Sequence, residues 1–213
     1  MLKPLPKLVQ TTFLPGILLL GVFSLVSCGS AAPEELDNIC DIFDEKSKWY
    51  KKAKRSSSRW GTSIPVMMSF VHQESKFQAR AKPPRTKILW IFPGPRPASA
   101  YGFAQATDDT WRSYKKATGK WAADRNDFAD AMDFIGWYND QSQRRNGIKK
   151  NDAYHLYLAY HEGQGGFAKR SYKNKKWLTD VAKKVSRRSG MYSEQLKSCE
   201  KKLNRGFFGR LFS

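Results

Sequence analysis

The stretch SIPVMMSFVHQESKF, residues 63–77, decides the fold of this chain because it carries a helix start, an apolar helical face and one carboxylate. Ser63 is a typical N-cap residue, and Pro65 fits the first helical turn. We therefore expect a helix that begins beside Ser63 and ends near Glu74. The residues of its apolar face recur at three- and four-residue steps: Met67, Phe70, Val71 and Glu74.

The position of Glu74 predicts a carboxyl group with a raised pKa. Burial and the negative end of the helix dipole both disfavour its charged form. A carboxyl group that holds its proton near neutral pH is suited to general acid catalysis. By itself the pattern favours the alternative, a solvated Glu74 at the edge of the stripe and paired with Lys76 or His72. The choice between the two depends on the rest of the sequence.

The rest of the chain is mostly helical in pattern. A proline-rich insert at 80–100 interrupts the helices with one strand-like run at 88–92. Helices joined by short capped turns predict a single, mostly α domain with a small loop and β insert. The other expected helices cover 36–54 before a break at 56–58, Thr107 or Asp108 to Gly119, about 126–145, Asn151 or Asp152 to Gly163, and two separate helices around Trp177 and Cys199.

The composition points to a polyanionic partner. The 213 residues include 38 Lys and Arg against 19 Asp and Glu, which gives a formal charge of +19 at pH 7. Seven Trp and thirteen Phe can supply a real core, which excludes a disordered chain. The charge suits nucleic acid, an anionic membrane or a bacterial cell wall, and it does not separate them.

The N-terminus has the layout of a secretory signal peptide over residues 1–27. Lys3 and Lys7 precede an apolar run at 13–26 that is too short and too interrupted for a membrane-spanning helix. Removal of this segment takes both lysines with it and lowers the formal charge from +19 to +17.

The residues Leu25-Val26-Ser27-Cys28 resemble the bacterial lipobox, in which the cysteine becomes the first mature residue and carries lipid. Residues 28–35 would then form the linker to the domain. Gly29 stands where an aspartate would suggest the inner membrane, so the resemblance implies the periplasmic face of the outer membrane. The alternative is an ordinary signal peptide with an incidental cysteine.

Cys40 and Cys199 remain as an even pair in a chain bound for an oxidising compartment, and we expect them to form a disulfide. Each lies on an apolar helical stripe. The bridge would close a loop of roughly 160 residues and add about 5 kcal/mol in the chain-entropy model. Two buried free thiols are the alternative, which export disfavours.

Three short motifs follow one another along the chain: HQESKF (72–77), YGFAQAT (101–107) and AYHEGQG (159–165). Together they resemble the three motifs of the soluble lytic transglycosylase (SLT) family, which are Glu-Ser-x-Phe, Gly-Leu-Met-Gln and Ala-Tyr-Asn-x-Gly. The resemblance covers about residues 60–190. It implies a goose-lysozyme-like domain over 36–204, followed by a cationic and aromatic tail at 205–213.

The resemblance assigns the acid and base chemistry to Glu74. Two positions depart from the family pattern, since Ala104 replaces its Met and His161 replaces its Asn. Glu162 occupies a variable position and is expected to be a surface residue. The resemblance also assigns substrate binding to Ser75, Tyr101, Gly102, Phe103, Gln105, Tyr160 and His161.

Three of these residues have a structural alternative. For Ser75 and Gln105 it is a hydrogen bond within a helix end or a turn. For Tyr160 it is a core position with a satisfied hydroxyl group.

The implied activity is cleavage of the bond between N-acetylmuramic acid and N-acetylglucosamine in peptidoglycan, with 1,6-anhydro products, one acid and base residue, and no metal or cofactor. Two other functions stay open. One is a lysozyme-like hydrolase, which needs a second carboxylate. The other is a non-catalytic envelope lipoprotein that binds peptidoglycan. The sequence has neither a set of zinc ligands nor an aromatic RNP motif, which argues against a nucleic-acid binder. The expected partners are therefore glycan strands and, through Cys28, a membrane.

Overall fold

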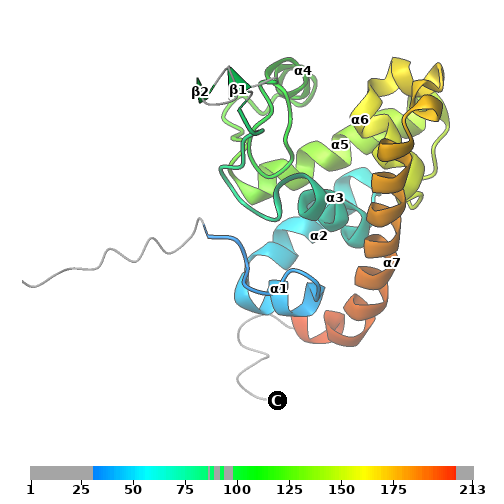
Figure 1. The fold of residues 1–213 in the computed structure, drawn as a ribbon. Helices are drawn as coiled ribbons and strands as arrows, with labels where there is room; N and C mark the ends of the chain where they lie inside the picture. The colour runs from blue at the N-terminus through cyan, green and yellow to red at the C-terminus, as the bar shows by residue number, and fades with distance from the viewer. Residues whose placement is uncertain (1–30, 86, 89–91, 94–97, 205–213) are drawn as a thin grey trace, which may run out of the picture.

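The computed structural model describes residues 31–85, 87–88, 92–93 and 98–204. The predicted signal peptide, the lipid-attachment residue Cys28 and the tail at 205–213 lie outside these residues. The described part confirms the expected lysozyme-like, mostly α single domain (Figure 1). Its elements in chain order are α1 (Ile39–Glu45), α2 (Trp49–Trp60), α3 (Ile64–Ser75), β1 (Lys87–Ile88), β2 (Phe92–Pro93), α4 (Asp108–Thr118), α5 (Phe128–Asn146), α6 (Ala153–Ala168), the 3-10 helix η1 (Ser171–Asn174) and α7 (Lys176–Asn204).

Helix α3 carries Glu74 and lies in the middle of the bundle (Figure 1). It begins where the sequence predicts, with Ser63 in extended conformation before it and Pro65 in its first turn. It packs against α2, α5 and α7. This packing buries nearly all of its length, from Ile64 to His72. None of the described helices combines the length and apolarity needed to cross a membrane.

The predicted helix over 36–54 is in fact two helices, α1 and α2, separated by residues 46–48. Helix α2 then continues through the predicted break at 56–58. The hydroxyl of Ser56 is buried and donates a hydrogen bond to the backbone carbonyl of Met132 on α5 (2.7 Å). Packing against α5 thus overrides the weak helix propensity of serine.

Helices α4, α5 and α6 begin close to where the sequence predicts, with Thr107 capping α4 and Asp152 capping α6. The predicted end of α6 is wrong, because the helix kinks at Gly163 (φ 75°, ψ 162°) and then continues. Helix α7 is one helix instead of two. Its buried residues keep three- and four-residue spacing from Leu178 to Leu196, so one apolar face stays in phase throughout.

The insert holds a two-stranded hairpin instead of the single predicted strand over 88–92. Strands β1 and β2 are antiparallel, with Lys87 opposite Pro93 and Ile88 opposite Phe92. The two ends of the apolar run therefore pair with each other.

The predicted disulfide is present between Cys40 on α1 and Cys199 on α7. It ties the first described helix to the last. Elsewhere in the core, the rings of Trp49 on α2 and Phe128 on α5 stack with centroids 3.9 Å apart. A covalent bond thus joins the first and last described helices, and aromatic stacking joins α2 to α5 in the core.

Candidate active site

Glu74 lies in the last turn of α3, with its carboxyl group enclosed by protein. The hydroxyl of Tyr157 on α6 donates a hydrogen bond to Oε1 of Glu74 (2.8 Å). Burial raises the pKa of Glu74 to about 7, although the bond from Tyr157 favours the charged form. The residue as a whole keeps partial exposure. Glu74 can therefore hold a proton near neutral pH while part of the residue stays accessible to solvent.

The chain turns sharply directly after this helix. Lys76 and Phe77 both adopt left-handed backbone conformations, with φ of 50° and 58°. Such conformations cost about 1–3 kcal/mol each in a non-glycine residue. The ring of Phe77 is fully buried against Trp49 and His72, with both centroid distances 6.0 Å. This anchor offsets the strain and fixes the end of α3 that carries Glu74.

The second motif forms a tight turn pinned by backbone contacts. Gly102 has a φ of 79°, and a Cβ there would lie 2.1 Å from the carbonyl oxygen of Arg125. The N–H of Phe103 donates to that same carbonyl (3.1 Å). The Phe103 side chain is 4% exposed and packs against Trp49 and Phe128. The predicted substrate contact of Phe103 is therefore corrected to a core position that supports the turn.

Gln105 ties this turn to the chain that follows α3. Its Nε2 donates hydrogen bonds to the carbonyls of Ala81 and Gly102, both at 2.9 Å. The carbonyl of Ala81 also accepts a bond from the N–H of Gly102 (3.0 Å). The turn hydrogen bond considered as the alternative for Gln105 is therefore present. The amide oxygen is its remaining polar atom and can act as an acceptor for a ligand.

Tyr160 joins the third motif to the second. Its hydroxyl donates to the backbone carbonyl of Ala104 (2.5 Å). Its ring packs edge-on against Phe70 and Tyr138, with centroid distances of 5.3 and 5.0 Å. Burial and then the charge of Glu74 raise the pKa of Tyr160 well above its usual value. Tyr160 is therefore a neutral residue with a satisfied hydroxyl, as in the structural alternative.

A pocket of about 200 Å³ opens between the second and third motifs. Three of the predicted residues line it, namely Gln105, Tyr160 and His161. Glu74 lies beside it rather than in its lining, close enough for its charge to act on Tyr160. The other lining residues are Ala106, Thr107, Thr110, Phe134, Tyr138, Glu162 and Gly163.

Four of the predicted substrate-binding residues lie outside this pocket: Gly102 and Phe103, described above, and Tyr101 and Ser75. Tyr101 lines a separate hollow, where cations of Lys82 and Arg125 lie 5.5 and 5.3 Å from its ring centroid. Ser75 is 5% exposed, and its hydroxyl donates to the carbonyl of Val71 within α3 (3.0 Å). The helix hydrogen bond considered for Ser75 is therefore present.

Glu162 is not the surface residue that the sequence predicts. Its side chain is 3% exposed and forms an ion pair with Lys175 at 2.8 Å. Burial works to raise the pKa of Glu162, but hydrogen bonds from Lys175, Ser171 and His161 together hold the pKa below its usual value. The chain that follows the kink at Gly163 brings Ser171 and Lys175 against this carboxylate, a contact that helical phase alone does not show.

Two residues beside the site were not predicted. Tyr157, which bonds Glu74, precedes Tyr160 by three residues on the same helical face, and that spacing could have indicated it. Trp177 is 57% exposed and meets His161 edge to face, with centroids 5.0 Å apart. The sequence shows Trp177 only as one apolar position of a helix.

A helical, lysozyme-like domain with an enclosed acid beside a pocket defines the class of this protein. The model of the transglycosylase SLT domain family matches residues 16–199, and the chain belongs to that family. The match spans the three motifs and both cysteines of the disulfide. A comparison with curated proteins finds no match. Within the described residues, no group of three or more His, Cys, Asp or Glu side chains gathers as a metal site.

Proposed function

We propose that this protein is a peptidoglycan lytic transglycosylase that cleaves the bond between N-acetylmuramic acid and N-acetylglucosamine without water. Membership of the SLT family supports this class of reaction. The observation that carries the proposal is the carboxyl group of Glu74, which is enclosed beside the pocket and has a pKa of about 7.

Glu74 begins the reaction as an acid. It gives its proton to the glycosidic oxygen while the bond from that oxygen to C1 of the muramic acid breaks. Positive charge develops at C1, where the N-acetyl group of the substrate assists. Glu74 then takes the proton of the C6 hydroxyl as that oxygen bonds to C1. The 1,6-anhydro ring closes and Glu74 is protonated again, so the enzyme is regenerated and no water is consumed.

The neighbouring residues have distinct roles in this scheme. Tyr157 engages Oε1 of Glu74 and stabilises the carboxylate that forms between the two proton transfers. Oε2 is then the oxygen for the proton. In the pocket, Gln105 and His161 supply polar groups for the sugar. Tyr160 holds the second and third motifs together.

The state of Glu162 favours the single-carboxyl mechanism over lysozyme-like hydrolysis. Hydrolysis requires a second carboxylate that acts on water or on C1. Glu162 is the acidic residue among those lining the pocket, and its oxygens accept hydrogen bonds from Lys175 and Ser171. A carboxylate engaged in this way is poorly placed to act as a nucleophile or base.

Mass spectrometry of digested peptidoglycan tests the reaction. We expect 1,6-anhydro muropeptides, and reducing-end muropeptides in their place would contradict the mechanism. Glu74→Gln should lower the rate about 10²- to 10⁴-fold through loss of acid and base catalysis. Glu194→Gln, an exposed carboxylate on α7, is the matched control and should keep full activity.

Zymography on a peptidoglycan gel separates this proposal from the binding lipoprotein. We expect the wild type to clear the gel and Glu74→Gln to leave it intact. A wild type that sediments with peptidoglycan and releases no muropeptide would instead support the binding function.

We further propose that the protein is exported and anchored by lipid at Cys28 to the periplasmic face of the outer membrane. The lipobox-like sequence supports this, and the disulfide suits an oxidising compartment. The net positive charge would then hold the enzyme against the anionic wall. Metabolic labelling with palmitate should mark the wild type and not Cys28→Ala. Equal labelling of both proteins would contradict the anchor.

A further inference from the structure

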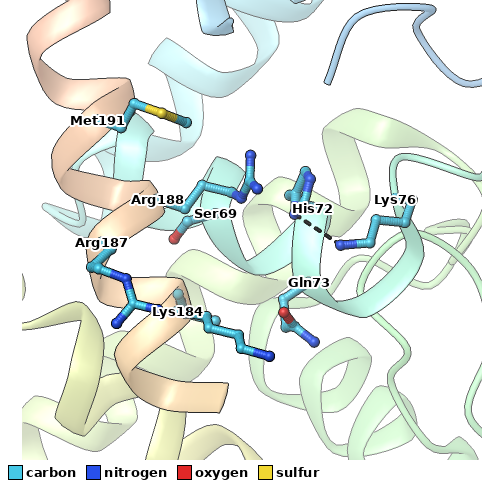
Figure 2. A pocket seen from close by; sticks show the side chains of 9 residues that line it. Ser69, His72, Gln73, Lys76, Lys184, Arg187, Arg188 and Met191 are labelled. Atoms are coloured by element: carbon cyan, nitrogen blue, oxygen red, sulfur yellow. Dashed lines mark hydrogen bonds between the residues drawn. The ribbon is translucent and has the colours of Figure 1, made fainter. Parts of the chain in front are cut away.

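A second pocket lies between α3 and α7. Its lining includes Gln73, the residue before Glu74 in the chain. Its volume is about 290 Å³. Arg188 and Lys184 reach from α7 toward His72 and Gln73 on α3 (Figure 2). None of its lining residues belongs to the pocket between the second and third motifs. It is therefore a separate site on the helix that carries the acid.

The pocket is strongly cationic. Lys76 lines it from the turn after α3, and Lys184, Arg187 and Arg188 line it from α7. The carboxylate of Asp37, just before α1, pairs with Arg188. Lys184 and Arg187 form no ion pair or side-chain hydrogen bond with any residue that the structure describes. Two cations thus remain for a ligand.

The cations act on the groups inside the pocket. Burial, and then the charges of Lys76 and Arg188, lower the pKa of His72 to about 4. Burial and then Arg188 also lower the pKa of Lys76. Nζ of Lys76 lies 3.2 Å from Nδ1 of His72, so the neutral imidazole can accept a hydrogen bond from the ammonium group. The excess of positive charge favours an anionic ligand.

The rest of the lining suits an organic acid. The exposed Met191 supplies apolar surface, and Gln73 supplies an amide. The guanidinium group of Arg187 and the ammonium group of Lys184 match the oxygens of a carboxylate. This combination fits a carboxylate on a small peptide better than a bare inorganic ion.

We propose that this pocket binds a carboxylate of the peptidoglycan stem peptide carried by the muramic acid beside the cleaved bond. The proposal rests on the proposed function, since it places peptidoglycan next to Glu74. Gln73 and Lys76 lie within one turn of Glu74 on a helix that is about 10–12 Å across with its side chains. A stem peptide of about four residues extends to about 14 Å, so it can reach round the end of α3 at the exposed Lys76.

The test uses the double variant Lys184→Gln with Arg187→Gln in the full chain. Its matched control is Lys173→Gln with Lys183→Gln, which removes the same charge outside the pocket. Each protein is assayed on glycan strands that carry stem peptides and on strands stripped of them by an amidase. The ratio of kcat/KM on peptide-bearing strands to kcat/KM on stripped strands should fall about three- to tenfold in the pocket variant. The ratio should be unchanged in the control.

Co-sedimentation with the same two kinds of strand, in the Glu74→Gln background, separates binding from cleavage. If the wild type cleaves neither substrate, the proposed function fails, and weaker retention of peptide-bearing strands by the pocket variant would still support the pocket. Equal behaviour of the two double variants would overturn the proposal. An equal loss of kcat/KM on stripped strands would also overturn the proposal, because the two cations would then act on the glycan polymer in general. Loss of binding to anionic lipid vesicles, with the strands unaffected, would assign the pocket to lipid headgroups and also overturn it.

Discussion

Glu162 lines the pocket and Glu74 lies beside it, and their surroundings shift their pKa values in opposite directions. Burial dominates at Glu74, whose Oε1 accepts a hydrogen bond from Tyr157. Glu162 is also covered, but a lysine and two further hydrogen-bond donors hold it in the charged form. Two carboxyl groups with separated pKa values can have separate roles. Here the proton donor is Glu74.

The pH dependence of kcat/KM should report the pKa of Glu74 in the free enzyme. The first step needs the protonated acid, so the rate should fall as the pH rises through about 7. Tyr157→Phe removes a bond that favours the charged form, which should raise the pKa of Glu74 and move this alkaline limb to higher pH by up to about one unit. The measurement is the pH profile of both proteins.

Tyr154→Phe makes the same change on α6 outside the contact with Glu74 and should leave the profile in place. An alkaline limb that stays fixed or moves to lower pH in Tyr157→Phe would show that the limb does not belong to Glu74.

Trp177 offers an exposed aromatic face next to His161 at the pocket. If the glycan passes over His161, Trp177→Ala should raise KM about three- to tenfold through lost apolar contact, with little change in kcat. Steady-state kinetics on glycan strands measures this split. Trp121→Ala, at another strongly exposed tryptophan, is the control. The same rise in KM for both variants would show that neither marks the path of the glycan.

At the scale of elements, the turn of the second motif depends on a glycine for two separate reasons. Gly102 has a positive φ, and the carbonyl of Arg125 occupies the space of a Cβ. Gly119 has a similar φ of 71° but open space around it. Gly119→Ala should therefore lower the free energy of unfolding by about 1–2 kcal/mol, the cost of the left-handed conformation alone.

Gly102→Ala should cost clearly more than Gly119→Ala, because the backbone must also move. Chemical denaturation of both variants measures the difference. The activity of Gly102→Ala should fall as well, since the turn positions Gln105. Equal stabilities of the two variants would show that the turn relaxes freely around the added methyl group.

Local signals made the helix starts predictable, while tertiary packing decided the rest. Caps such as Thr107 and Asp152 act within their own turn, and the sequence shows them directly. The continuation of α2 through Ser56 depends on a partner on α5, which no local pattern contains. Likewise, an apolar run at 88–92 does not show whether it lies in one strand or pairs with itself.

The same distinction applies to the site. Helical phase placed Glu74 on the apolar face of its helix, but the resemblance of the three motifs was needed to favour a catalytic role over a solvated side chain. Phe103 could not be placed, because the left-handed residues of its turn send its ring into the core. Glu162 was misplaced because the residues that cover it, Ser171 and Lys175, lie beyond the kink at Gly163 and outside the third motif.

At the scale of the whole molecule, the disulfide Cys40 to Cys199 joins α1 to the C-terminal part of α7. Replacing both cysteines by serine should lower the free energy of unfolding by about 2–5 kcal/mol, because the unfolded chain is no longer closed into a long loop. Thermal and chemical unfolding measure the loss. A reductant should destabilise the wild type by a similar amount and leave the double variant unchanged. A wild type insensitive to reductant would contradict the contribution of the bridge.

Helix α7 also fastens the start of the domain, since the hydroxyl of Tyr192 donates to the carbonyl of Leu36 and Asp37 pairs with the same helix. About eight residues separate Leu36 from Cys28. Pro33 is buried against the domain, so only the roughly five residues from Cys28 to Pro33 set the reach, which is roughly 18 Å when fully extended. A lipid on Cys28 would therefore keep the domain close to the bilayer, and the enzyme would act only on the glycan layer nearest the membrane. A longer linker between Cys28 and the domain would let the enzyme act on more distant glycan without any change to the active site.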